Sequence, residues 1–139
     1  MTLELIPLGT MTAELQQPFI LDGTPVGGRW IFEVASAVME GERLTAKLKG
    51  QAAADWLIVG PDGTGTLDVR ALMETDDGAL IFVQYNGRVD VSAGGAAPTY
   101  ATPRYETGDD RYRWLNKIQA VAKGQLNGST LTYDVYELR

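Results

Sequence analysis

The residues of this chain that could do chemistry are carboxylates, tyrosines and arginines. Its 139 residues include no His and no Cys, which excludes a Ser-His-Asp triad, a thiolate nucleophile and the usual zinc ligands. Proton transfer by Asp or Glu, hydrogen bonding by Tyr and charge stabilisation by Arg remain. This set suits isomerisation, cyclisation, hydration or elimination beside a carbonyl group, with no cofactor and no metal ion.

Asp55 is the carboxylate that we expect to act as a catalytic base. It begins the short apolar run Asp55-Trp-Leu-Ile-Val, where an ionisable residue is out of character. Inside an apolar barrel its pKa would rise, which would make it a better base near neutral pH. The alternative is that Asp55 caps the start of a strand or accepts a hydrogen bond from a loop amide. Glu106 is a second catalytic candidate, unless it is a solvated loop residue.

Two further candidates follow from the turn at Asp77-Gly78, a dipeptide favoured in tight hairpins because both central positions take positive φ. A two-residue loop here pairs Arg70 with Tyr85 on neighbouring strands, on a largely apolar face. We predict that Arg70 acts in catalysis and that both residues anchor an anionic or carbonyl ligand. The alternative places Arg70 on an exposed face, paired with a neighbouring acid.

The segment from Tyr100 to Asn116 mixes aromatic residues with Arg and Glu, a composition typical of pocket linings. If Asn127-Gly128 forms the second hairpin turn, one strand face collects Trp114, Asn116 and Tyr133. For Asn116 the alternative is a structural role, in which it ties a strand end to a loop carbonyl. The predicted ligand-binding residues are Tyr85, Trp114, Asn116, Phe82 and Tyr133.

Short strands must position these side chains. Gly occurs 16 times, and β-prone runs alternate with turn signals. We expect strands at 3–15, 28–39, 43–49, 55–59, 66–75, 79–87, 99–107, 114–122 and 130–138, with at most one helical turn near 109–113. Several of these runs are apolar on both faces, which favours a barrel over a sandwich. The sequence therefore predicts an all-β protein, a single antiparallel β-barrel of about 8–10 strands spanning residues 1–139.

Composition restricts the partners. The net charge of −6 argues against nucleic acid, whose phosphates an acidic surface repels. No apolar run approaches the ~20 residues of a membrane-spanning helix, and the N-terminus lacks the basic head of a signal peptide. We expect a cytoplasmic protein that binds a small molecule and neither nucleic acid nor membrane.

The strand at 67–73 carries apolar residues on both faces. A short barrel with few helices cannot easily cover an apolar outer wall, and large exposed apolar patches usually mark interfaces. We therefore expect a homodimer or a higher homo-oligomer with this strand at or near the contact.

Several motifs, taken together, resemble the domain-of-unknown-function family 3237 over nearly the whole chain. They are Gly27-Gly28-Arg29, Asp55-Trp56, Pro61-Asp62-Gly63, Thr75-Asp76-Asp77-Gly78-Ala79-Leu80-Ile81, Thr102-Pro103-Arg104-Tyr105-Glu106-Thr107, Tyr112-Arg113-Trp114-Leu115-Asn116 and Tyr133-Asp134-Val135-Tyr136. The resemblance implies a compact antiparallel β-barrel, similar to the allene oxide cyclase and dirigent type, with small-molecule chemistry or binding. Tyr105 departs from the family pattern, where Phe is more usual, and its extra hydroxyl is either harmless or alters the polarity of the pocket.

Two functions stay open at this point. One is a cofactor-independent lyase or isomerase that acts on a small aromatic or carbonyl compound inside the barrel. The other is a carrier or binding module that holds a small hydrophobic ligand in the same pocket without changing it.

Overall fold

The chain folds into ten strands and two short 3-10 helices. The computed structural model describes all residues, 1–139. The elements are β1 (Leu5–Leu15), β2 (Phe19–Thr24), β3 (Gly27–Glu40), β4 (Ala46–Val59), β5 (Thr64–Thr75), β6 (Leu80–Asp90), η1 (Val91–Ala93), β7 (Thr99–Ala101), β8 (Arg104–Glu106), η2 (Asp110–Lys117), β9 (Ala120–Asn127) and β10 (Thr130–Leu138).

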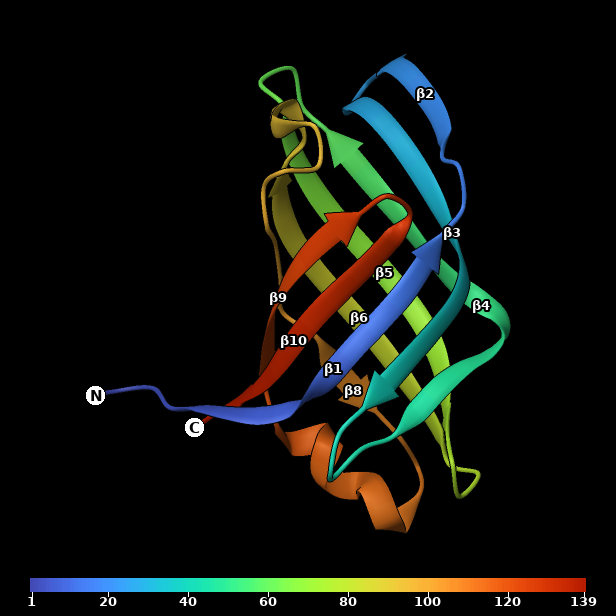
Figure 1. Ribbon diagram of the computed structural model, residues 1–139, viewed down its shortest axis with the longest axis vertical. Helices are drawn as coiled ribbons and strands as arrows, with labels where there is room; N and C mark the ends of the chain where they lie inside the picture. Colours follow the sequence, from blue (N-terminus) through green and yellow to red (C-terminus); the bar gives the residue numbers. More distant parts are fainter.

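The sheet closes on itself. Its order runs β1-β10-β9-β7-β6-β5-β4-β3, and pairing of β1 with β3 completes the ring. Both β7 and β8 pair with β6, so these two short strands share one position and the ring has eight. All of these pairings are antiparallel, which confirms the predicted all-β barrel (Figure 1). The two strands expected at 43–49 and 55–59 are one strand, β4, with an irregular pairing between Leu48 and Ala53.

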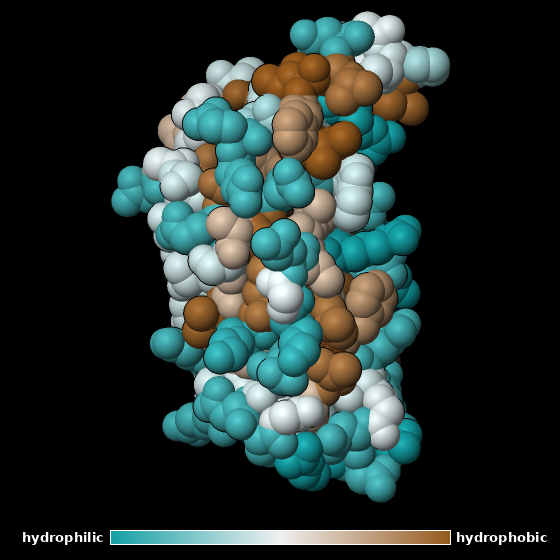
Figure 2. Space-filling model, turned by 90° about the vertical axis from the view of Figure 1, so that its right-hand side faces the viewer, coloured by the Kyte–Doolittle hydropathy of each residue, from teal (hydrophilic) through white to brown (hydrophobic).

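One strand that the sequence analysis did not predict, β2, lies outside the ring. β3 is 14 residues long and pairs with β1 near its C-terminal end and with β2 near its N-terminal end. The β2–β3 hairpin therefore projects beyond the barrel, at the upper end in Figure 1. Phe19, Ile20 and Leu21 of β2 and Val26 of the turn are exposed. Figure 2 shows apolar side chains gathered at this end of the molecule.

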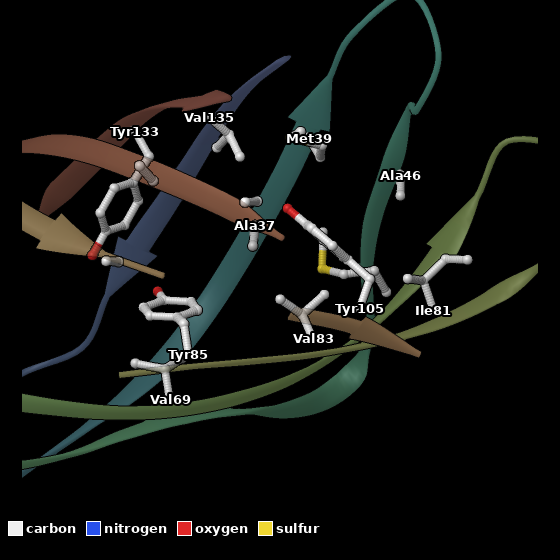
Figure 3. Packing of buried hydrophobic residues seen from close by; sticks show 14 of the residues in the cluster. Ala37, Met39, Ala46, Val69, Ile81, Val83, Tyr85, Tyr105, Tyr133 and Val135 are labelled. Carbon is white, nitrogen blue, oxygen red and sulfur yellow. The ribbon is translucent and has the colours of Figure 1, made fainter. Parts of the chain in front are cut away.

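The lumen is filled by residues that alternate along the strands. On β5, Leu67, Val69 and Met73 are buried in the core cluster, as a period of two predicts for a strand with one face inward. Figure 3 shows their neighbours in the cluster from β3, β6, β8 and β10. The outer face of β5 carries Asp68, Arg70, Leu72 and Glu74. The expected apolar outer wall on this strand is therefore wrong, because its apolar series points inward. The homo-oligomer itself stays a prediction.

The lower end of the barrel is covered by η2 (Figure 1), where the sequence analysis placed the start of a strand at 114–122. Tyr112, Leu115 and Ile118 recur every third residue, and Leu115 is fully buried while the other two pack against the core. A 3-10 helix has three residues per turn, so this spacing puts Tyr112 and Leu115 on one face of η2, and Ile118 follows as its C-cap with extended backbone. Strand β9 begins only at Ala120.

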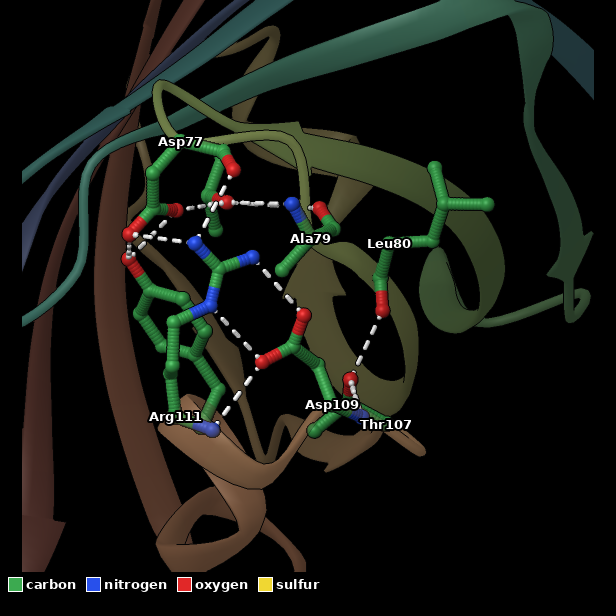
Figure 4. A network of polar contacts seen from close by, with 8 residues as sticks. Asp77, Ala79, Leu80, Thr107, Asp109 and Arg111 are labelled. Atoms are coloured by element: carbon green, nitrogen blue, oxygen red, sulfur yellow. Dashed lines mark hydrogen bonds and ion pairs between the residues drawn. The ribbon is translucent and has the colours of Figure 1, made fainter.

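A polar network fastens η2 to the turn between β5 and β6 (Figure 4). Tyr112 donates a hydrogen bond to the Asp77 carboxylate (2.9 Å), and Thr75 donates to the same group (2.6 Å). The Arg111 guanidinium lies 3.3 Å from the Asp77 carboxylate and 2.8 Å from that of Asp109. The contacts of Tyr112 and Arg111 with Asp77 are exposed, whereas the Thr75 contact is partly buried. Together they link the helix to the barrel end.

Candidate functional site

The turn that positions Arg70 and Tyr85 differs by one residue from the prediction. Thr75 N–H donates to the Ala79 carbonyl (2.8 Å) across a three-residue loop that ends at Gly78, with φ of 89°. Tyr85 therefore pairs with Val69, and Arg70 pairs with Gln84. A shift of one residue moves a side chain to the other face of the sheet. Tyr85 points into the lumen, Arg70 is exposed on the outer wall, and the predicted Arg70–Tyr85 pair is wrong.

The second hairpin differs from the prediction by two residues. Its loop is Gly128-Ser129, and Val135 pairs with Ala122 instead of Ala120. A shift of two residues preserves the face of every side chain, so Tyr133 lies in the lumen as expected and is 1% exposed.

Three of the predicted site residues meet in the lumen. Asp55 stands on β4 between Phe32 of β3 and Val69 of β5. The rings of Tyr85 and Tyr133 pack edge to face with their centroids 5.8 Å apart, and Figure 3 shows their hydroxyl groups directed into the lumen. Burial raises the pKa of both phenols, and the Asp55 carboxylate raises each pKa further. Both tyrosines are therefore protonated at neutral pH and lie within electrostatic reach of Asp55.

The environment of Asp55 raises the pKa of its carboxyl group. Burial raises the pKa of Asp55 from 3.8 to about 6, although a hydrogen bond from the Asp68 N–H to its Oδ1 (3.0 Å) acts in the opposite direction. The backbone pairing of β4 with β5 is interrupted at the two residues after Asp55 and continues at Ile58. Asp55 lies inside β4 and accepts the amide of Asp68 from the middle of β5. It therefore neither begins a strand nor binds a loop amide, and its pKa is raised.

Asp55 borders a cavity at the upper end of the barrel, beside the projecting hairpin. The volume of this upper cavity is about 330 Å³. Most of its wall is apolar, and the segment that follows β6 contributes residues between Asp90 and Ala97. The lining residues are Leu15, Trp30, Phe32, Asp55, Leu57, Leu67, Val89, Asp90, Val91, Gly94, Gly95, Ala97, Thr99, Leu126 and Leu131. The connection between η1 and β7 therefore supplies part of the cavity wall.

A second, much smaller cavity lies within the core. Its volume is about 20 Å³, and Tyr85, Tyr105 and Tyr133 are its polar lining residues. The Tyr133 hydroxyl is buried and has no hydrogen-bond partner in the protein. A buried polar atom without a partner is uncommon, and a space of this size is sufficient for one water molecule. Tyr105, the departure from the family pattern, places its additional hydroxyl in this part of the lumen.

The other predicted site residues lie away from Asp55. Phe82, Glu106 and Asn116 border a groove on the outside of the barrel. Asn116 accepts a hydrogen bond from the Thr107 N–H (2.8 Å) and donates one to the Thr107 carbonyl (2.9 Å), which is the structural role considered for it. Trp114 lies at the lower end of the barrel, where the centre of its ring is 4.8 Å from Cζ of Arg43.

The sequence analysis missed the aromatic wall of the upper cavity. Trp30 and Phe32 line it from β3, and Leu57 lines it from β4. The spacing of two between Trp30 and Phe32, inside a strand that was predicted, was the available signal. It could not show which face of that strand turns inward.

Two further geometric findings concern ions and membranes. No group of three or more His, Cys, Asp or Glu residues is arranged to hold a metal ion. Neither helix has the length and the apolar character needed to cross a bilayer.

Comparison with solved structures places this barrel among similar ones. A conserved protein of unknown function from Rhodopseudomonas palustris has a TM-score of 0.90 and 25% identity, covering 100% of this chain and 99% of that one. A β-barrel-like protein from Acinetobacter baumannii AYE has a TM-score of 0.89 and 28% identity, covering 100% and 98%. An enzyme from Penicillium herquei is similar in fold, with a TM-score of 0.68 and 21% identity over 99% of this chain and 94% of its own.

The sequence comparisons agree with the fold. A UPF0311 protein of Rhodopseudomonas palustris (strain ATCC BAA-98 / CGA009) is 24% identical over 150 residues, covering 99% of this chain and 97% of the relative. The family model described as "Protein of unknown function (DUF3237)" matches residues 3–138. This nearly complete match confirms the resemblance seen in the motifs, and the chain belongs to the DUF3237 family.

Proposed function

We propose that the protein is a cofactor-independent lyase or isomerase that moves a proton on a small, largely apolar carbonyl compound held in the upper cavity. The observation that carries this proposal is the Asp55 carboxylate, whose pKa is raised to about 6 at the wall of an apolar cavity of about 330 Å³. A base whose pKa lies close to the working pH is the kind that general-base catalysis favours.

The proton transfer needs no oxidant or reductant. Asp55 takes a proton from the carbon beside the carbonyl group, the C–H electron pair forms a carbon–carbon double bond, and the carbonyl π pair moves to the oxygen. Return of the proton to a different atom completes an isomerisation, whereas loss of a leaving group from the next carbon completes an elimination. Because Oδ1 already accepts the Asp68 N–H, Oδ2 is the oxygen that receives the proton.

The environment below Asp55 supports this role. Tyr85 and Tyr133 remain neutral because burial raises the pKa of each. They therefore add polar hydroxyl groups near Asp55 without adding a competing charge. The likeness to the Penicillium herquei enzyme concerns the fold alone, so the proposal rests on Asp55 and its cavity.

The test is hydrogen–deuterium exchange at carbon. The protein is incubated in D2O with neutral one- and two-ring ketones, including 2-tetralone, and loss of the α-proton signal is followed by NMR. We expect catalysed exchange that rises with pH through about 6, as Asp55 becomes ionised. Asp55→Asn should abolish it. Glu106→Gln, a change on the outer wall of the barrel, should leave it unchanged.

The contrary outcomes are distinct. Equal exchange by wild type and a folded Asp55→Asn variant would remove Asp55 from the mechanism. Ligand binding without any exchange, with the ligand recovered unchanged, would support the carrier function instead.

A further inference from the structure

The upper cavity contains negative charge and no positive charge. Its charged lining residues are Asp55 and Asp90, and neither Lys nor Arg lines it. The nearby Arg29 guanidinium donates to the Trp56 carbonyl (2.9 Å) in an exposed position. An anionic ligand in this cavity would therefore meet carboxylates with no cation to offset them.

The two carboxylates differ in their exposure to solvent. Asp90 is exposed and accepts hydrogen bonds from the backbone N–H and the hydroxyl of Ser92, both at Oδ1. Asp55 accepts one hydrogen bond, from the Asp68 N–H to Oδ1. A carboxylate oxygen has room for further donors, and Asp55 is the less exposed of the two residues, so a ligand in the apolar part of the cavity would donate to Oδ2 of Asp55.

The apolar wall strengthens both effects. Trp30, Phe32, Leu57 and Leu131 line the same cavity as Asp55 with side chains that carry no charge. Repulsion between like charges and attraction between a donor and a carboxylate both grow as the local dielectric constant falls. The volume of about 330 Å³ lies at the small end of ligand pockets, which suits one ring or two fused rings.

We propose that the upper cavity selects uncharged molecules of one or two rings that carry a hydroxyl donor, such as a phenol or an enol, and rejects carboxylates and phosphates of the same size. The inference rests on the proposed function in that both use Asp55 and this cavity, but it concerns binding alone. An enol presents its hydroxyl where a ketone presents its acidic C–H, so the same carboxylate serves both.

The test compares two ligands of the same shape by isothermal titration calorimetry at pH 7.5. 2-Naphthol should bind at least tenfold more tightly than 2-naphthoate to the wild-type protein. Asp55→Asn should narrow this ratio at least threefold, because the amide carries no charge and its N–H groups can donate to a carboxylate. Asp134→Asn, an exposed change on β10, should retain the wild-type ratio.

Three results would overturn the inference: equal affinities in the wild type, an unchanged ratio in a folded Asp55→Asn variant, or no binding of 2-naphthol at millimolar concentration. Failure here is separable from failure of the proposed function. Selective binding without carbon exchange would refute the enzyme and leave this inference standing. Catalysed exchange on a ketone without the charge selectivity would do the reverse.

Discussion

Replacing Asp55 by Asn should stabilise the barrel, and the gain should grow with pH. The native pKa of about 6 lies above the ordinary value of 3.8, so the folded protein holds this proton more tightly than the unfolded chain does. Below pH 3.8 both states are protonated and Asp55 has no effect. Between pH 3.8 and 6 the unfolded chain ionises first, and unfolding becomes easier as pH rises. Above pH 6 the penalty is constant.

The magnitude follows from the two pKa values. They lie about 2 pH units apart, which at 1.36 kcal/mol per unit gives up to about 3 kcal/mol above pH 7 and about 1 kcal/mol at pH 4.5. Asn keeps an oxygen that can accept the Asp68 N–H, so the hydrogen bond survives the change. For a chain of this length, about 3 kcal/mol corresponds to a rise in Tm of roughly 10 °C.

The assay is urea unfolding of the wild type and of Asp55→Asn at pH 4.5 and pH 8, followed by circular dichroism. The difference between the two proteins isolates Asp55, because every other group titrates in both. Asp134→Asn serves as the exposed control and should change stability by less than about 0.5 kcal/mol at either pH. A variant less stable than wild type at pH 8, or a difference independent of pH, would refute the argument that burial dominates this carboxyl group.

Three further changes test the packing and one tests assembly. Tyr133→Phe should keep or raise the free energy of unfolding in urea, because it removes a buried hydroxyl that has no partner in the protein; a clear loss would reveal a partner. Gly124→Ala should destabilise by about 1–3 kcal/mol, because the new Cβ would lie 2.6 Å from the Tyr133 ring, and an unchanged urea midpoint would contradict this. Asp77→Ala should lower Tm and speed amide exchange in η2, which loses its anchor; unchanged exchange would show that apolar packing holds the helix. Light scattering should give a multiple of 15.1 kDa that Ile20→Lys, on the exposed β2, reduces to the monomer mass; a monomeric wild type would end the prediction of a homo-oligomer.

The sequence alone determined the fold class and the kind of chemistry. Apolar residues at every second position predict strands that bury one face, and too few helical segments exist to cover an open sheet. The absence of His and Cys restricted the candidate bases to carboxylates. Asp55 was recognisable as a candidate site residue because burying an ionisable side chain in an apolar strand costs free energy.

The tertiary structure decided the register and therefore the membership of the site. Asp77-Gly78 is compatible with a loop of two or three residues, and in the three-residue loop that forms, Asp77 contacts Tyr112 and Arg111, which lie far away in sequence. One residue of register exchanges the two faces of a strand. Tyr85 consequently entered the lumen while Arg70 was left outside.

For Asp55 too, the sequence showed the residue but not its surroundings. Its position in the chain marks it as unusual, but its pKa depends on burial by residues that lie far away in sequence. Pairing of β1 with β3 closes the barrel around it, and residues between Asp90 and Leu131 complete the cavity wall. Burial is a property of all these segments together, so only the folded chain shows that Asp55 borders an apolar cavity.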